Sequence, residues 1–139
     1  MRILLALSVS GKPRTIDMIA AMDFISVYGK TFGLTNENLH GENYYKYGEF
    51  TARRTIIKKA IRQLLISDMI DVYEKEDGYY FNLNDAGEAY CSSLNSEYAN
   101  EYVQASRAVT VYIGAKMDKD VIRDIMSKSS TGIMSGGAR

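Results

Sequence analysis

The stretch FTARRTIIKKAIRQLLISDMIDVYEKEDGYYFNL, residues 50–83, decides the predicted fold because a helical pattern is followed at once by a strand pattern. Residues 50–65 repeat apolar side chains at helical spacing and predict an amphipathic helix. Residues 69–73 and 79–83 alternate as two strands around a tight turn of the type Glu-Asp-Gly, which is typical of a β-hairpin. The stretch therefore predicts a helix that leads into a hairpin.

The predicted helix carries five cationic side chains and no acidic one, although the whole chain has a formal net charge of zero. Four of these cations form a stripe beside the apolar face: Arg54, Lys58, Lys59 and Arg62. A solvated helix face is one interpretation of the stripe, since lysine and arginine are common on surfaces. Because the helix itself offers no acidic partner, we identify these residues as candidates for binding DNA phosphates or an acidic protein surface.

Two predicted helices precede this segment. The apolar start of the chain, residues 3–7, is interpreted as a first buried helix rather than a secretion signal, because Gly-Lys-Pro-Arg follows where a cleavage region is expected. Thr15 then caps a helix over residues 16–28. Asp23 and Arg53 both project onto apolar helical faces, and an isolated buried ion is costly, so we predict that these two residues pair with each other.

The part of the chain after the hairpin predicts one long helix. Apolar positions recur at spacings of three and four from Tyr90 to Tyr112, and Gly114 marks the end of the pattern. A short amphipathic helix follows from Asp118, and residues 129–139 form a Ser/Gly-rich tail without a packing pattern.

The order of these elements defines the expected fold class, which is mainly α with a small β-hairpin. Two helices, a basic helix, a hairpin and another helix follow each other as in a winged helix-turn-helix, with the basic helix in the position that enters a major groove. We expect a winged-helix domain over residues 1–92, a C-terminal helical extension with its long helix over residues 93–128, and a flexible tail over residues 129–139. A helical bundle with an incidental hairpin is the competing interpretation.

Composition limits the function classes. The 139 residues have a sequence pI near 6.6, so any affinity for nucleic acid or membrane must come from a local patch. A single cysteine, Cys91, permits no internal disulfide, and with the single histidine, His40, it gives no set of metal ligands. No apolar run has the length of a membrane span. We expect a cytoplasmic protein without a metal or cofactor.

Two tyrosine-rich segments are candidates for a protein interface, because aromatic residues with hydrogen-bonding groups are enriched at interface hot spots. One lies in the loop before the basic helix and the other forms a stripe on the long helix; together they comprise His40, Tyr44, Tyr45, Tyr47, Tyr98, Tyr102, Val109 and Tyr112. The stripe is equally compatible with packing on its own domain. No set of nucleophile, base and oxyanion donors is evident, so we do not expect an enzyme.

The hairpin tip argues against ordinary operator binding. Its sequence Glu74-Lys75-Glu76-Asp77 is mostly acidic and is expected to be repelled by phosphates, whereas a wing that grips DNA usually carries cations.

Several short motifs, taken in order, resemble a known family: Met22-Asp23-Phe24 with Tyr28, Leu39-His40-Gly41, Gly48-Glu49-Phe50, Arg53-Arg54-Thr55-Ile56-Ile57, and Leu64-Leu65 to Met69-Ile70. The combination resembles the middle components of ABC three-component systems, which include the small subunit of Lamassu-type anti-phage complexes. The resemblance covers roughly residues 1–70.

The resemblance implies a non-enzymatic adaptor subunit that joins an SMC-like ABC ATPase to an effector subunit, in a complex that senses foreign DNA. Contact of this chain with double-stranded DNA is expected to be secondary. The alternative is a stand-alone winged-helix transcription regulator that reads a palindromic site as a dimer.

Overall fold

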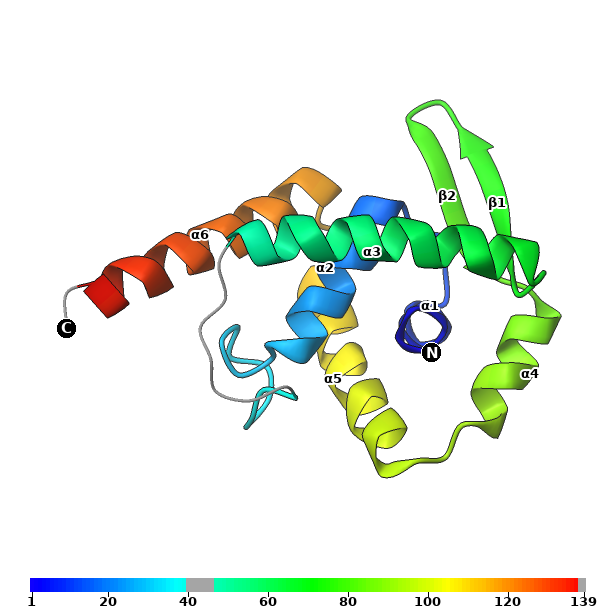
Figure 1. The fold of residues 1–139 in the computed structure, drawn as a ribbon, viewed down its shortest axis with the longest axis horizontal. Helices are drawn as coiled ribbons and strands as arrows, with labels where there is room; N and C mark the ends of the chain where they lie inside the picture. Colours follow the sequence, from blue (N-terminus) through cyan, green and yellow to red (C-terminus); the bar gives the residue numbers. More distant parts are fainter. Residues whose placement is uncertain (40–46, 138–139) are drawn as a thin grey trace.

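The computed structural model describes residues 1–39 and 47–137, with the side chains of residues 1–39 and 48–128. This part of the chain is mainly helical and contains one two-stranded antiparallel sheet (Figure 1). Its elements are α1 (Arg2–Ser10), α2 (Ile16–Val27), α3 (Tyr47–Ile66), β1 (Ile70–Lys75), β2 (Gly78–Leu83), α4 (Asp85–Ser93), α5 (Glu97–Ile113) and α6 (Asp118–Gly137).

Helix α2 is the centre of the core. The Thr15 side chain caps it by accepting a hydrogen bond from the Met18 N–H at 3.1 Å, as predicted. Every residue of α2 from Met18 to Val27 is buried, because α1, α3, α5 and α6 all pack against it. A helix that is apolar on all sides requires such enclosure. The predicted first helix is also present, and its residues Ile3 to Leu7 are buried.

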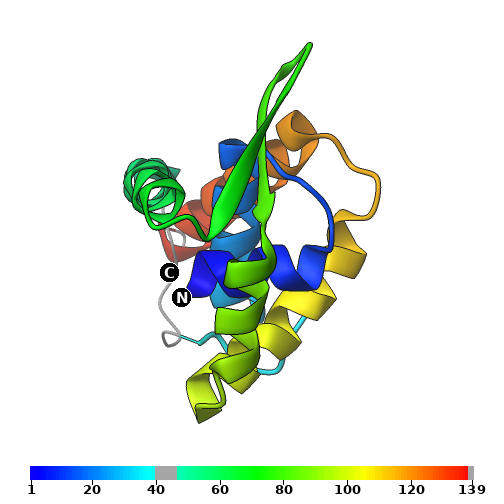
Figure 2. The ribbon, with the colours of Figure 1, turned by 90° about the vertical axis from the view of Figure 1, so that its right-hand side faces the viewer.

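Helix α3 runs across one side of this core, and the hairpin rises from its C-terminal end (Figures 1 and 2). Ile57 and Ile61 hold the helix on the core, being 4% and 1% exposed. The hairpin pairs Ile70 with Leu83 at its base and Lys75 with Gly78 at its tip. Its base is buried whereas the outer part extends beyond the helices, so most of the hairpin surface faces solvent.

The predicted long helix from Tyr90 is wrong, because α4 ends at Ser93 and α5 begins at Glu97. Ser96 ends the interruption by accepting a hydrogen bond from the Ala99 N–H at 3.1 Å, which is the standard role of an N-cap serine. The break lets α4 pack on α1 and β2 while α5 packs on α1 and α2. A continuous helix cannot make both sets of contacts.

Helix α6 is also longer than predicted. Residues 129–137 continue it to Gly137, within the range for which a flexible tail is predicted. The segment contains no proline, and extension of an existing helix adds one backbone hydrogen bond for each residue fixed. Ile113, Val121 and Ile125 of α5 and α6 are fully buried in the same core as α1 and α2, so one core spans both sides of the expected boundary after residue 92.

Candidate functional site

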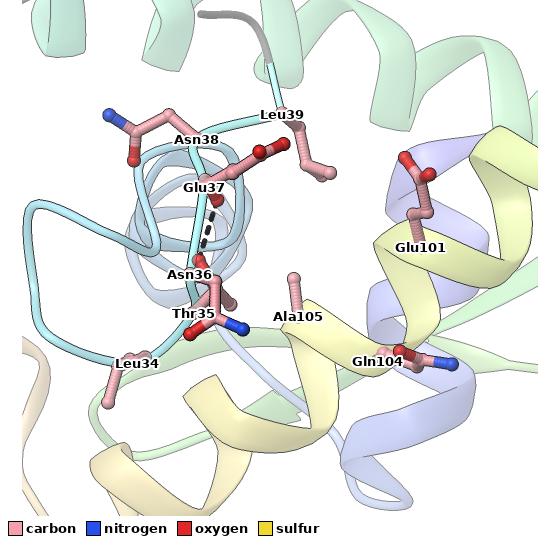
Figure 3. A pocket seen from close by; sticks show the side chains of 9 residues that line it. All are labelled: Leu34, Thr35, Asn36, Glu37, Asn38, Leu39, Glu101, Gln104 and Ala105. Carbon is pink, nitrogen blue, oxygen red and sulfur yellow. Dashed lines mark hydrogen bonds between the residues drawn. The ribbon is translucent and has the colours of Figure 1, made fainter. Parts of the chain in front are cut away.

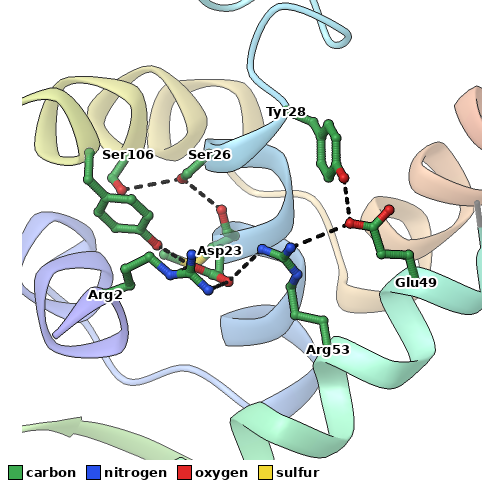
Figure 4. Close-up of polar contacts among 9 residues, drawn as sticks. Arg2, Asp23, Ser26, Tyr28, Glu49, Arg53 and Ser106 are labelled. Atoms are coloured by element: carbon green, nitrogen blue, oxygen red, sulfur yellow. Dashed lines mark hydrogen bonds and ion pairs between the residues drawn. The ribbon is translucent and has the colours of Figure 1, made fainter. Parts of the chain in front are cut away.

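The buried carboxylate of Asp23 is the centre of a polar network inside the helical core (Figure 4). The Tyr102 hydroxyl of α5 donates to its Oδ1 atom at 2.7 Å. The Arg2 Nε atom of α1 lies 3.1 Å from Oδ1, and the Arg53 Nη1 atom of α3 lies 3.4 Å from Oδ2. The predicted contact between Asp23 and Arg53 is therefore confirmed, but two further partners complete the site.

This network joins four helices through one carboxylate. Two guanidinium groups compensate the charge of Asp23, which is 0% exposed, and a buried carboxylate needs such partners. Burial and the neighbouring Asp23 charge raise the pKa of Tyr102 well above its ordinary value, so its hydroxyl remains a donor. The arrangement fixes the relative positions of α1, α2, α3 and α5, and it is a structural cluster.

The network continues to Glu49 at the start of α3. Its carboxylate accepts a hydrogen bond from the Tyr28 hydroxyl and lies 3.5 Å from the Arg53 guanidinium (Figure 4). Burial and this hydrogen bond raise the pKa of Tyr28 to about 12. The beginning of α3 is thus tied to the end of α2.

The predicted basic stripe divides into two parts. The Arg54 guanidinium pairs with Asp17 in the first turn of α2, so it has a counter-charge within the protein. Lys58, Lys59 and Arg62 are exposed, and within the described residues none of them forms an ion pair. We call these three residues the basic flank. They are the part of the stripe that is free to bind an external anion.

The hairpin forms a second charged surface, of opposite sign. Asp71, Glu74, Glu76 and Asp77 are all exposed. The nearby Lys75 lies over the Tyr80 ring at 4.4 Å, and the Tyr80 hydroxyl donates to Asp77 at 2.7 Å. We call this surface the acidic hairpin. Its excess of carboxylates matches the expectation drawn from the sequence.

The predicted aromatic interface on the long helix is wrong for Tyr102 and Val109, which are both 0% exposed. Helix α5 packs on α1 and α2, so burial of this stripe completes the apolar core of the chain itself. The outward side of α5 carries instead Val111, which is 82% exposed.

The other predicted interface residues differ in their environments. Tyr112 is half-buried, and its hydroxyl donates to Asp124 of α6 at 2.6 Å. Tyr98 is half-buried beside Tyr102, with ring centroids 6.5 Å apart. His40, Tyr44 and Tyr45 lie outside the described residues, and of Tyr47 only the backbone is described, as the first residue of α3.

A pocket of about 620 Å³ lies between residues 34–39 and helix α5 (Figure 3). Glu37 contributes from the loop, and Glu101 and Gln104 contribute from the helix. Thr35 donates its hydroxyl to the Glu37 carbonyl at 2.7 Å. The lining therefore offers carboxylates and carboxamides for hydrogen bonding, and no nucleophile paired with a base is found among these residues.

None of the helices in the described residues has the length and apolarity needed to cross a membrane. No group of three or more His, Cys, Asp or Glu side chains is gathered there in a way that could hold a metal ion.

A family model matches nearly the whole chain. The family model described as ABC-three component (ABC-3C) system Middle Component 2 matches residues 1–135. No curated protein and no solved structure matches this chain.

Proposed function

The chain belongs to the middle component 2 family of ABC three-component systems, and from this premise we propose that it is a non-enzymatic adaptor between an SMC-like ABC ATPase and an effector subunit. Family membership makes the chain a component of an ABC three-component anti-phage system that works together with other components. The adaptor role, the identity of the two partners, a Lamassu-type subfamily and the sensing of foreign DNA in the cytoplasm are parts of the proposal.

The main support for the proposal is that the chain exposes two surfaces of opposite charge, the basic flank and the acidic hairpin. The basic flank of α3 consists of three cations without an ion-pair partner in the described part of the chain, and the acidic hairpin follows α3 directly. A surface of each sign favours partners of different charge, because complementary potentials speed encounter and like charges exclude wrong partners. An adaptor needs two contact surfaces, one for each partner, on one rigid core.

The topology supports a winged helix-turn-helix assignment within this proposal. The backbone of Arg14, between α1 and α2, bridges Phe81 of β2 and so adds a third strand-like segment beside the hairpin. The order α1, Arg14 bridge, α2, α3, β1, β2 is compatible with a winged helix, in which α3 would be the recognition helix, and this supports the proposal. Such domains serve both as DNA readers and as protein contacts.

Charge distinguishes the adaptor from the alternative regulator. In a winged-helix regulator the basic flank would lie on the helix that enters the major groove, but the acidic hairpin would be the wing and would repel phosphates. We therefore propose that the chain mainly contacts proteins and that its contact with DNA is secondary. A regulator is expected to bind duplex DNA alone with a steep dependence on salt, whereas the adaptor is expected to bind it weakly alone.

The test is reversal of the basic flank in the complex. The triple variant Lys58→Glu, Lys59→Glu, Arg62→Glu should keep the fold, because all three side chains are exposed, but should lose phage resistance and co-purification with one of the components encoded beside this chain. The matched control reverses three exposed lysines that are not part of α3, Lys12, Lys119 and Lys128, and should retain both properties. Full phage resistance and intact complexes in the α3 variant would refute this use of the basic flank.

A further inference from the structure

The two edges of the hairpin are unequal. On the outer edge of β2, the Phe81 N–H donates to the Arg14 carbonyl at 2.7 Å and the Phe81 carbonyl accepts from the Arg14 N–H at 2.9 Å. The Leu83 N–H donates to the Asn82 side-chain oxygen, also at 2.9 Å. The outer edge of β2 is therefore occupied at Phe81 and Leu83 by groups of this chain.

The outer edge of β1 is open. In an antiparallel pair, the N–H and C=O of one residue point either both toward the neighbouring strand or both away from it. Phe81 directs both groups to Arg14, so its register partner Val72 directs both groups away from β2. The same alternation applies to Glu74, two residues further along β1. Within the described residues, no segment on the far side of β1 bonds to the backbone of Val72 or Glu74.

The side chains around this open edge define its chemistry. Val72 is 49% exposed, so an incoming strand meets an apolar side chain as well as backbone groups. Four carboxylates surround the edge and the adjoining turn, Asp71, Glu74, Glu76 and Asp77. Lys75 is the single cation within residues 70–77, which leaves three net negative charges, four minus one.

We propose that the open edge of β1 binds an extended, basic segment of another component of the three-component system by strand addition. The inference rests on the proposed adaptor function and assigns one of its two contacts. Backbone groups of Val72 and Glu74 supply the hydrogen bonds of the new ladder, and the surrounding carboxylates select lysine or arginine on the added strand. Edge-to-edge pairing with the hairpin of a second copy is disfavoured because it brings two segments with three net negative charges each together. DNA is disfavoured because its phosphates are also negative.

Hydrogen exchange in the assembled complex tests the proposal directly. The probe is the set of components encoded beside this chain, co-purified with it. The Val72 and Glu74 amides should exchange rapidly in the free chain and at least about a hundredfold more slowly in the complex, because ladder amides open only with local dissociation. The Tyr73 amide, which points to β2 in the same ladder, serves as an internal control and should be protected in both samples.

A backbone variant provides the second measurement. Val72→Pro removes the outward N–H without removing a hydrogen bond between β1 and β2, and should weaken the complex about tenfold. Val72→Thr keeps both the N–H and the β-branched shape, and should bind like the wild type. Thermal unfolding of the free variants shows whether the hairpin is retained; if Val72→Pro fails to fold, the exchange of the wild-type amides decides alone.

The results of these experiments distinguish a failure of strand addition from a failure of the adaptor function. A wild-type complex in which the Val72 and Glu74 amides still exchange rapidly overturns strand addition and leaves the adaptor function in place. Failure of the wild-type chain to join any complex removes both. Protection that rises with the concentration of the chain alone, or on addition of duplex DNA, identifies another occupant and also overturns the proposal.

Discussion

Replacing Asp23 with asparagine tests whether the buried network holds the four helices together. The amide keeps the shape of the side chain and an acceptor for the Tyr102 hydroxyl, so the change removes mainly the charge that faces Arg2 and Arg53. Both guanidinium groups are then left beside a neutral side chain. Breaking a buried ion pair by removing one partner typically costs roughly 3–5 kcal/mol.

The structure places Asp23→Asn at the lower end of that range. The Arg2 side chain is 30% exposed and so keeps part of its hydration, and Arg53 retains Glu49 at 3.5 Å. We expect the free energy of unfolding to fall by about 3 kcal/mol, which for a domain of this size lowers the midpoint of thermal unfolding by about 10 °C. The measurement is unfolding of the full chain by urea and by heat, followed by circular dichroism.

Asp17→Asn is the matched control because it makes the same chemical change in the same helix. The pair of Asp17 with Arg54 is exposed on both sides, at 39% and 45%, so its loss should cost less than about 1 kcal/mol. If Asp23→Asn destabilises the chain no more than Asp17→Asn does, the assignment of Asp23 as the carboxylate that fixes the helices is refuted.

Two further predictions concern the close approach of Gly87 to Met69 and the titration of Tyr28. Gly87 of α4 lies under the carbonyl of Met69, where an added Cβ would be 2.2 Å from that oxygen, so Gly87→Ala should destabilise the chain by more than about 1 kcal/mol in urea unfolding. Gly48→Ala, in the open first turn of α3, should leave it unchanged or more stable. The pKa of Tyr28 is raised from 10.0 to about 12 in the folded chain, so the folded state holds this proton longer and the free energy of unfolding should fall as the pH rises between these two values. Tyr28→Phe should remove that part of the pH dependence, and an identical slope in the variant would show that the Tyr28–Glu49 contact does not contribute.

Local pattern was sufficient for much of the architecture. The sequence around α2 and α3 predicted both helices, the Thr15 cap and the hairpin, because each depends on residues a few positions apart. The contact between Asp23 and Arg53 was also predictable, since each charge interrupts an apolar helical face and a buried ion requires a partner.

The partners of these residues across long sequence separations depended on tertiary packing. Arg2 and Tyr102 reach Asp23 from positions 21 and 79 residues away, and no periodicity marks either residue as its neighbour. Asp17 likewise neutralises Arg54 from another helix, which reduced the predicted stripe to the three residues of the basic flank.

The face of α5 that carries Tyr102 and Val109 is the clearest case in which the sequence could not predict the packing partner. Helical periodicity is a local property, so it was enough to place Tyr102 and Val109 on one amphipathic stripe. That α1 and α2 cover this stripe, and that the break after Ser93 brings α5 against them, followed from the packing of the whole chain. The hydrophobic effect is non-directional, so burial against a partner protein or against the core of the same chain stabilises an apolar stripe equally well. The geometry of the whole chain selects between the two.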